Sequence, residues 1–307
     1  MSAREIAWTN IELECSSRQR RALLFAPNLG FDQHSLKTLE SEKPLLIAFH
    51  GGSGQAEQME RLTGFMKLAE QENFFVVYPQ GVNRHWNDGR NLPKRKEIDD
   101  VQFVVELIDH LRQSYPIDRQ RVYACGISNG GFFAQYLAAR APGLIAAVAS
   151  VAATVHEPMY KTIAPLEPVP IMFVVGKDDP VIPFAGGEIE LASRKAGLVV
   201  SAEDSFNYWA AANHAGSEFE EQILPALPAD GLTELTGFAD CTDETRVLKR
   251  TYSAANGKPV VVYIIEGGGH AWPGGWQYYR EKYIGKTSQQ LDASSEILSF
   301  LWQFKRD

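Results

Sequence analysis

Short apolar runs recur along this chain and alternate with segments whose apolar residues follow a helical period. The runs at 44–50 and 74–78 are almost wholly apolar, as expected for strands that are buried on both faces of a sheet. Residues 99–115 instead place apolar side chains on one face of a helix, with Asp99 as the predicted N-cap. Strands that alternate with helices predict a mostly parallel sheet with helices on both faces, so the expected fold class is α/β. The other expected strands are 20–26, 121–125, 145–151, 170–175 and 260–265, and the other expected helices are 132–140, 203–214 and 291–304.

A single domain is expected over residues 1–307, because α/β folds of this length often form one unit and no linker divides the sequence. Residues 218–240 are the least regular part, since prolines and glycines interrupt them. We expect that segment to be a loop excursion over the sheet and a candidate for part of an active-site wall.

The charge balance argues against a nucleic-acid partner. The formal net charge is -8, and the densest basic group, residues 94–96, is followed at once by acidic residues. A nucleic-acid interface would need a basic face.

The first residues give no targeting signal. Residues 1–17 lack the basic start, the apolar run and the small-residue cleavage site of a signal peptide. The longest apolar stretch, 144–155, is too short to span a bilayer. The sequence therefore predicts a soluble protein without a membrane partner, cytoplasmic as it stands, or secreted if a leader has been removed. It leaves the oligomeric state open.

The sequence has three cysteines, Cys15, Cys125 and Cys241. A small, odd number of cysteines argues against a disulfide framework. Free thiols are expected, although a pairing of Cys15 with Cys241 stays open. No HExxH motif and no paired Cys/His spacing is present, so neither a metal nor a cofactor is expected.

The segment Gly126–Gly130 has the pattern G-x-S-x-G with Ser128 at its centre. It follows the apolar run 121–125 and opens the expected helix, which is the strand–turn–helix setting of a nucleophile elbow. Such a turn pushes the serine hydroxyl out of the sheet, and small flanking residues let strand and helix approach closely. Ser128 is the candidate nucleophile, and a glycine-rich helix entry without chemistry is the alternative.

A second glycine loop, His50–Gly54, directly follows the run 44–50. Glycines there can present backbone N–H groups to a developing oxyanion. We assign the two donors to the N–H groups of Gly52 and Asn129. A phosphate-binding loop is the alternative, but the lysine of that motif is missing.

The best-placed histidine is His270, which follows the run 260–265 and three glycines. Sites on open α/β sheets lie at the carboxyl ends of the strands. An acid should follow another late strand, and the run 170–175 leads to Asp178 and Asp179. We choose Asp179, with Asp178 as the fallback. The order Ser, Asp, His along the chain is that of α/β-hydrolases.

Seven motifs between about Leu23 and Phe304 carry a resemblance to a known family. They are HGGSG (50–54), YPQG (78–81), WNDGR (86–90), IDDVQFV (98–104), GISNGGFFA (126–134), GKDDPVIPF (176–184) and GGGHAWPGG (267–275). Together they resemble the polyhydroxybutyrate depolymerase and feruloyl-esterase-like branch of the α/β-hydrolases. The resemblance supports Ser128 and His270, and it favours Asp179 because the family's acid directly precedes a proline. It also implies that Trp86 and Trp272 lie near the substrate, with rigid packing as the alternative.

The expected function is therefore a serine esterase that acts through an acyl-enzyme. Its expected substrates are small esters, aryl esters of the feruloyl type, or hydroxyalkanoate oligomers. A serine peptidase on the same fold and a non-catalytic binding protein are the alternatives.

Overall fold

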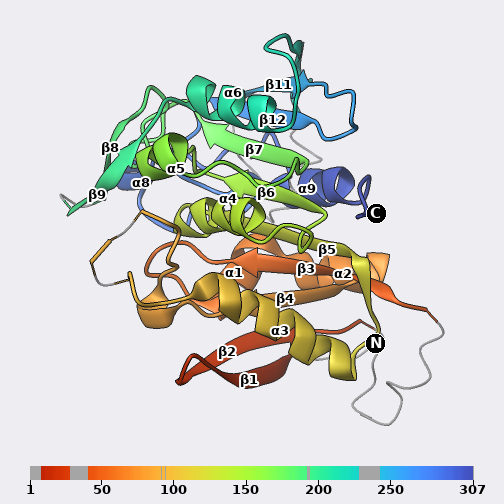
Figure 1. Ribbon diagram of the computed structural model, residues 1–307. Coiled ribbons are helices and arrows are strands. Elements are labelled where there is room, and N and C mark those ends of the chain that lie inside the picture. Colours follow the sequence, from red (N-terminus) through yellow and green to blue (C-terminus); the bar gives the residue numbers. More distant parts are fainter. Residues whose placement is uncertain are drawn as a thin grey trace, which may run out of the picture.

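The computed structural model describes residues 8–27, 41–90, 92–93, 95–191, 194–227 and 243–306. Its centre is a ten-stranded sheet (Figure 1). In spatial order the strands are β1 (Thr9–Cys15), β2 (Arg18–Phe25), β4 (Phe75–Pro79), β3 (Lys43–Phe49), β5 (Ile117–Ile127), β6 (Ala147–Val151), β7 (Ile171–Gly176), β12 (Val260–Glu266), β11 (Arg246–Tyr252) and β10 (Glu220–Ile223).

The six central strands, from β4 to β12, are parallel. They are flanked by the antiparallel strands β2 and β11, and the edge strands β1 and β10 pair antiparallel with β2 and β11. The strands β4, β6 and β7 are buried along their whole length, which explains their nearly continuous apolar sequences. The parallel arrangement brings the carboxyl ends of β3, β5, β7 and β12 to one edge of the sheet.

Helices cover both faces, so the sheet has a hydrophobic core on each side (Figure 1). One core contains side chains of α3 (Asp100–Ser114), α4 (Asn129–Arg140), α5 (Glu157–Thr162) and α6 (Ala202–Ala212). The other contains side chains of α1 (Ala56–Thr63), α2 (Phe65–Glu72) and α9 (Ala293–Leu301). The α/β fold class predicted from the sequence is thereby confirmed.

Local sequence explains how α3 begins. The side chain of Asp99 accepts a hydrogen bond from the backbone N–H of Gln102, as its predicted role as N-cap requires. Buried side chains then recur along one face, including Phe103, Leu107 and Leu111.

Some elements differ from the expectation. The irregular segment 218–240 contains β10, an exposed strand at the edge of the sheet, and its residues 228–240 lie outside the described ranges. The hairpin of β8 (Gly187–Leu191) and β9 (Arg194–Val199), the helices α1 and α2, and the short helix α8 (Glu281–Ile284) were not predicted. The two hairpin strands contain no continuous apolar run, and these helices are shorter than the window of about 11–18 residues over which a helical period is recognised.

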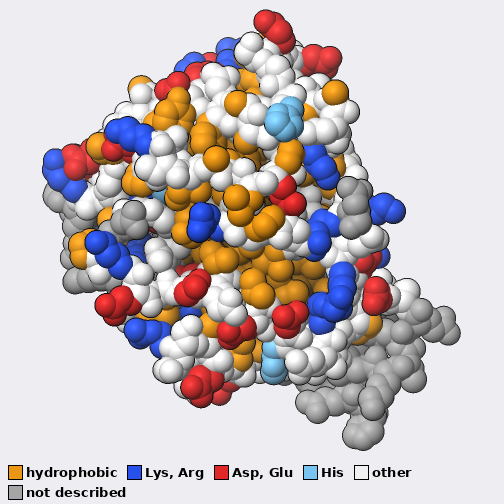
Figure 2. Space-filling model, in the orientation of Figure 1, with side chains coloured by type: hydrophobic (Ala, Val, Ile, Leu, Met, Phe, Trp, Pro, Cys, Tyr) orange, Lys and Arg blue, Asp and Glu red, His pale blue; other side chains and the backbone are white. Residues whose placement is uncertain are grey.

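The face toward the viewer shows hydrophobic side chains in the middle of the region that α3, α4 and α5 cover (Figure 2). Lys and Arg side chains are interspersed with Asp and Glu around it. Within the described ranges, no helix has the length and apolar character to cross a bilayer.

Candidate active site

Ser128 occupies a strained turn between β5 and α4. Its backbone has φ 56° and ψ −120°, a conformation that residues with a Cβ rarely adopt. The backbone N–H of Ser128 donates to Val151 of the neighbouring strand β6 at 2.9 Å, which fixes the turn at the sheet edge.

The glycines on either side of the serine are required by close backbone contacts. A Cβ on Gly126 would lie 2.4 Å from the carbonyl oxygen of Gly130. A Cβ on Gly130 would lie 2.3 Å from the carbonyl oxygen of Phe49, at the end of β3. The G-x-S-x-G pattern therefore reflects the packing of a helix start against two strands.

His270 and Asp179 form a buried pair at the same edge of the sheet. The Nδ1 atom of His270 lies 2.8 Å from Oδ2 of Asp179, and the two residues are 4% and 8% exposed. The other oxygen of Asp179 accepts the backbone N–H groups of Val181 and Ile182 at 2.7 and 2.8 Å. The carboxylate is thus fixed from both sides.

The neighbouring carboxylate points elsewhere. Asp178 is exposed, and its Oδ2 accepts the backbone N–H of Gly267 at 2.8 Å. Of the two candidate acids, the structure therefore places Asp179 against His270.

The loop that carries His270 is held by its backbone. The N–H of His270 donates to the carbonyl of Ile284 at 2.5 Å, and its carbonyl accepts the hydroxyl of Tyr278 at 2.7 Å. Among the described side chains, a hydrogen bond joins His270 to Asp179 but not to Ser128. Such bonds to the nucleophile often tighten only when substrate is bound.

The glycine loop after β3 lies against the serine turn. A Cβ on Gly51 would be 3.6 Å from Cβ of Ser128, and a Cβ on Gly52 would be 3.7 Å from Cβ of Asn129. Among the described residues, neither the N–H of Gly52 nor that of Asn129 has a hydrogen-bond acceptor within the protein. The two predicted oxyanion donors are therefore neighbours with free N–H groups.

The side chain of His50 connects this glycine loop to Gly81, which follows β4. It is 2% exposed, its Nδ1 contacts the carbonyl of Gly51 at 2.7 Å, and its Nε2 accepts the N–H of Gly81 at 3.0 Å. Burial lowers the pKa of His50 to about 4, so the ring is neutral at pH 7.

The two tryptophans expected near the substrate are inside the protein. Trp86 is 0% exposed, stacks on Phe133 at 5.1 Å between ring centroids, and donates from Nε1 to the carbonyl of His50. Trp272 is 1% exposed and donates from Nε1 to Ser294. Their buried positions favour the packing role over the substrate-contacting role.

A small apolar cluster joins the loops around the serine and the acid. It contains Phe132 of α4, Val181 and Ile182 after Asp179, and Ile284 of α8. The hairpin β8–β9 contributes further apolar side chains to it. These side chains are buried, so the cluster is a packed apolar region beside the site.

Sequence reasoning did not single out Asp88 and Arg90, although both lie in the WNDGR motif. Asp88 is 1% exposed, pairs with Arg90 at 2.6 Å, and accepts a hydrogen bond from the Nδ2 atom of Asn129 at 2.6 Å. The signal available in the sequence was the presence of two oppositely charged residues, two positions apart, in this motif.

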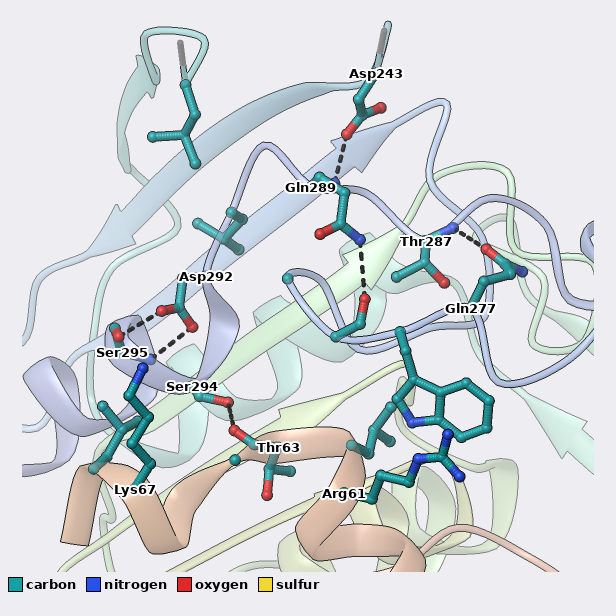
Figure 3. Close-up of a pocket in the computed structure, with 18 of the residues that line it drawn as sticks. Arg61, Thr63, Lys67, Asp243, Gln277, Thr287, Gln289, Asp292, Ser294 and Ser295 are labelled. Atoms are coloured by element: carbon teal, nitrogen blue, oxygen red, sulfur yellow. Dashed lines mark hydrogen bonds between the residues drawn. The ribbon is translucent and has the colours of Figure 1, made fainter. Parts of the chain in front are cut away.

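A cavity of about 740 Å³ lies in another part of the molecule (Figure 3). Its lining comes from α1, α2, the segment 274–295, Leu227 and Asp243. Arg61 and Thr63 lie on one side of it, and Gln277 and Thr287 lie on the other. None of the predicted site residues lines it.

Cys15 and Cys125 are buried, whereas Cys241 lies outside the described residues, as does its possible pairing with Cys15. Within the part of the chain that the structure describes, no group of three or more His, Cys, Asp or Glu side chains is arranged to hold a metal ion.

His156 gives a pH prediction for stability. It is fully buried, and burial lowers its pKa to about 4 although Asp88 acts in the opposite direction. The unfolded chain takes up the proton near pH 6.5, and the folded protein only near pH 4. The contribution of the neutral His156 to the free energy of unfolding is therefore complete above about pH 6.5. It is lost as the pH falls, and the loss is about 2 kcal/mol between pH 7 and pH 5.

Urea unfolding at pH 7 and pH 5 checks this expectation. His156→Asn should reduce the loss of unfolding free energy between the two pH values by that amount, and the exposed His110→Asn should not. An equal loss in His156→Asn and the wild type would contradict the assignment.

A mostly parallel sheet that carries a strained serine turn, a glycine loop and a buried His–Asp pair at one edge defines an α/β-hydrolase. Residues 36–222, more than half of the chain, match the family described as esterase PHB depolymerase. The chain belongs to this family, and it is a carboxylic ester hydrolase, as the sequence predicted.

Curated relatives agree with this membership. The chain is 31% identical over 271 residues to "Putative esterase NocK" of Nocardia uniformis subsp. tsuyamanensis, covering 86% of this chain and 75% of that protein. It is 25% identical over 262 residues to poly(3-hydroxyalkanoate) depolymerase C of Paucimonas lemoignei, covering 80% of this chain and 59% of that protein. It is 29% identical over 187 residues to feruloyl esterase B of Piromyces equi, covering 59% of this chain and 34% of that protein.

Two solved structures share the fold. A thermostable esterase has a TM-score of 0.56 at 15% identity, with 97% of this chain and 63% of that chain covered. The acetyl xylan esterase of Aspergillus awamori has a TM-score of 0.54 at 12% identity, with 86% and 94% covered.

Proposed function

We propose that the chain, as a single catalytic domain, hydrolyses carboxylic esters through a triad of Ser128, His270 and Asp179. The observation that carries the proposal is the buried His270–Asp179 hydrogen bond of 2.8 Å at the sheet edge that also holds the strained serine turn. A serine, a histidine and an oriented carboxylate are the parts that acyl transfer requires.

In the proposed reaction, Nε2 of His270 removes the proton from Ser128 as the hydroxyl oxygen attacks the ester carbonyl. Asp179 accepts the Nδ1–H of the imidazole, so Nε2 keeps the lone pair that a base needs. The same carboxylate stabilises the imidazolium that forms. The alcohol leaves with the proton from His270, and water then hydrolyses the acyl-enzyme by the same steps.

The oxyanion of each tetrahedral intermediate is proposed to bind the N–H groups of Gly52 and Asn129. These two N–H groups are adjacent and have no acceptor among the residues that the structure describes, which supports this role. Each donor of this kind contributes about 3 kcal/mol to the transition state.

The proposed substrates are small esters, aryl esters of the feruloyl type and hydroxyalkanoate oligomers. The names of the relatives support these classes, since they include a poly(3-hydroxyalkanoate) depolymerase and a feruloyl esterase.

A fluorophosphonate probe tests the nucleophile directly. We expect one label per chain, located on the peptide that contains Ser128 by mass spectrometry, and we expect His270→Ala to suppress labelling. A label on another serine would contradict the proposal.

A hydrolysis panel tests the reaction class. It compares p-nitrophenyl esters of increasing acyl length, methyl ferulate and hydroxybutyrate oligomers with an amide of the same acyl group. Turnover of esters alone supports the esterase, amide turnover at a similar rate favours the peptidase, and labelling without any turnover favours a binding protein.

A further inference from the structure

The buried carboxylate of Asp88 lies directly behind the proposed oxyanion hole. Its side chain is 2% exposed, and Oδ2 accepts the Nδ2–H of Asn129 at 2.6 Å and the Nη2–H of Arg90 at 2.6 Å. A further hydrogen bond from Nε of Arg90, at 3.0 Å, reaches both carboxylate oxygens. The carboxylate is therefore fixed by charged and neutral donors together.

Both hydrogen-bond donors of the Asn129 side chain are used by this arrangement. Its Oδ1 accepts the backbone N–H of Trp86 at 2.9 Å, and its Nδ2 donates to the carbonyl of Trp86 at 3.2 Å as well as to Asp88. The side chain thus has no donor left for an oxyanion, and the backbone N–H of Asn129 is the donor that this residue can offer.

Arg90 extends the arrangement to the apolar cluster beside the site. Its Nη1 donates to the carbonyl of Ala196 in β9 at 2.9 Å, and its guanidinium lies 4.7 Å from the ring centre of Phe132. Burial tends to raise the pKa of Asp88, but the charge and hydrogen bonds of Arg90 outweigh it and the pKa is lowered. Asp88 therefore stays ionised beside a compensating cation.

We infer that Asp88 is a positioning residue for ester hydrolysis, which holds Asn129 so that its backbone N–H points at the oxyanion. The inference rests on the proposed function, because it needs the N–H of Asn129 as a donor. A donor must lie about 2.7–3.1 Å from the oxyanion, so a small shift of the first turn of α4 reduces the stabilisation of the transition state. Without Arg90, the negative charge of Asp88 would disfavour the oxyanion, which explains why the two are paired.

Asp88→Asn removes the charge from the bond to Asn129 and tests the inference. We expect kcat for p-nitrophenyl acetate to fall by about 10- to 100-fold, with KM within about twofold of the wild type. The inhibition constant of phenylboronic acid, whose adduct with serine is tetrahedral, should rise by the same factor as kcat falls. A merely structural role would lower the melting temperature and leave kcat and the boronate affinity of the folded enzyme unchanged.

Asp100→Asn is the matched control. Asp100 is also a buried carboxylate, it pairs with Arg20 at 2.6 Å, and it binds the backbone N–H of Asn87 instead of Asn129. We expect this variant to lose stability but to keep kcat within about threefold, because it breaks no bond to the elbow. A loss of kcat as large as that of Asp88→Asn would overturn the inference.

Removing the amide partner gives a second test. If Asp88→Asn does not fold, Asn129→Ala breaks the same bond without changing the charge, and it should lower kcat and boronate affinity together. An unchanged kcat in the folded variant would overturn the inference, whereas turnover by Ser128→Ala would show that the proposed function itself is wrong.

Discussion

Replacing Ser128 with alanine is expected to lower kcat by about five orders of magnitude or more and to leave the fold intact. The reason is that no other group can form the acyl-enzyme, so only binding and the oxyanion hole remain. Ester hydrolysis measured at high enzyme concentration, with circular dichroism as the check on folding, gives the result. Normal turnover by the folded variant would exclude Ser128 as the nucleophile.

A second substitution at the same position separates strain from chemistry. Ser128→Gly should be as inactive as Ser128→Ala, but it should have a free energy of unfolding about 1 kcal/mol higher than the alanine variant. Glycine adopts φ 56° without the clash that a Cβ causes there. Equal stability of the two variants would mean that the turn stores little strain.

Asp179→Asn should lower kcat by about four orders of magnitude while it changes the structure little. Asparagine can still accept the N–H groups of Val181 and Ile182 through one oxygen. The group that faces Nδ1 of His270 becomes an amide donor, which drives the ring proton to Nε2 and removes the base. Steady-state kinetics on a p-nitrophenyl ester would measure the loss.

Asp178→Asn is the matched control for that variant. Asp178 is exposed, and an asparagine oxygen can keep its hydrogen bond to the N–H of Gly267. We expect kcat within about threefold of the wild type, because surface substitutions of this kind have small effects. A larger loss in Asp178→Asn than in Asp179→Asn would move the acid to the other residue.

The central strands could be predicted because they are buried on both faces. A run such as 171–176 is apolar throughout, and that composition does not depend on which strand lies beside it. The edge strand β10 gave no such signal, since all four of its residues are exposed. The helices α1 and α2 are eight residues each, which is shorter than the window of about 11–18 residues over which a helical period is recognised.

The functional site, like the fold, could be predicted from the sequence only in part. The glycines around Ser128 and before His270 could be found from the sequence because close backbone contacts leave room for no other residue. The tryptophans could not be assigned, because a buried ring and a substrate platform have the same composition. The role of Asp88 depends on its 2.6 Å contact with Asn129, which is 41 residues away in the sequence.

The sequence by itself determined the fold class, the serine turn and the glycine loop, because each depends on local periodicity or on backbone geometry that only glycine allows. The tertiary structure decided the direction in which each of the two adjacent aspartates points, with Asp179, the residue chosen from the sequence, against His270. It alone showed which carboxylate supports the turn that carries Ser128. Those choices depend on the direction in which neighbouring side chains point and on contacts between distant segments, and neither is written in the local order of residues.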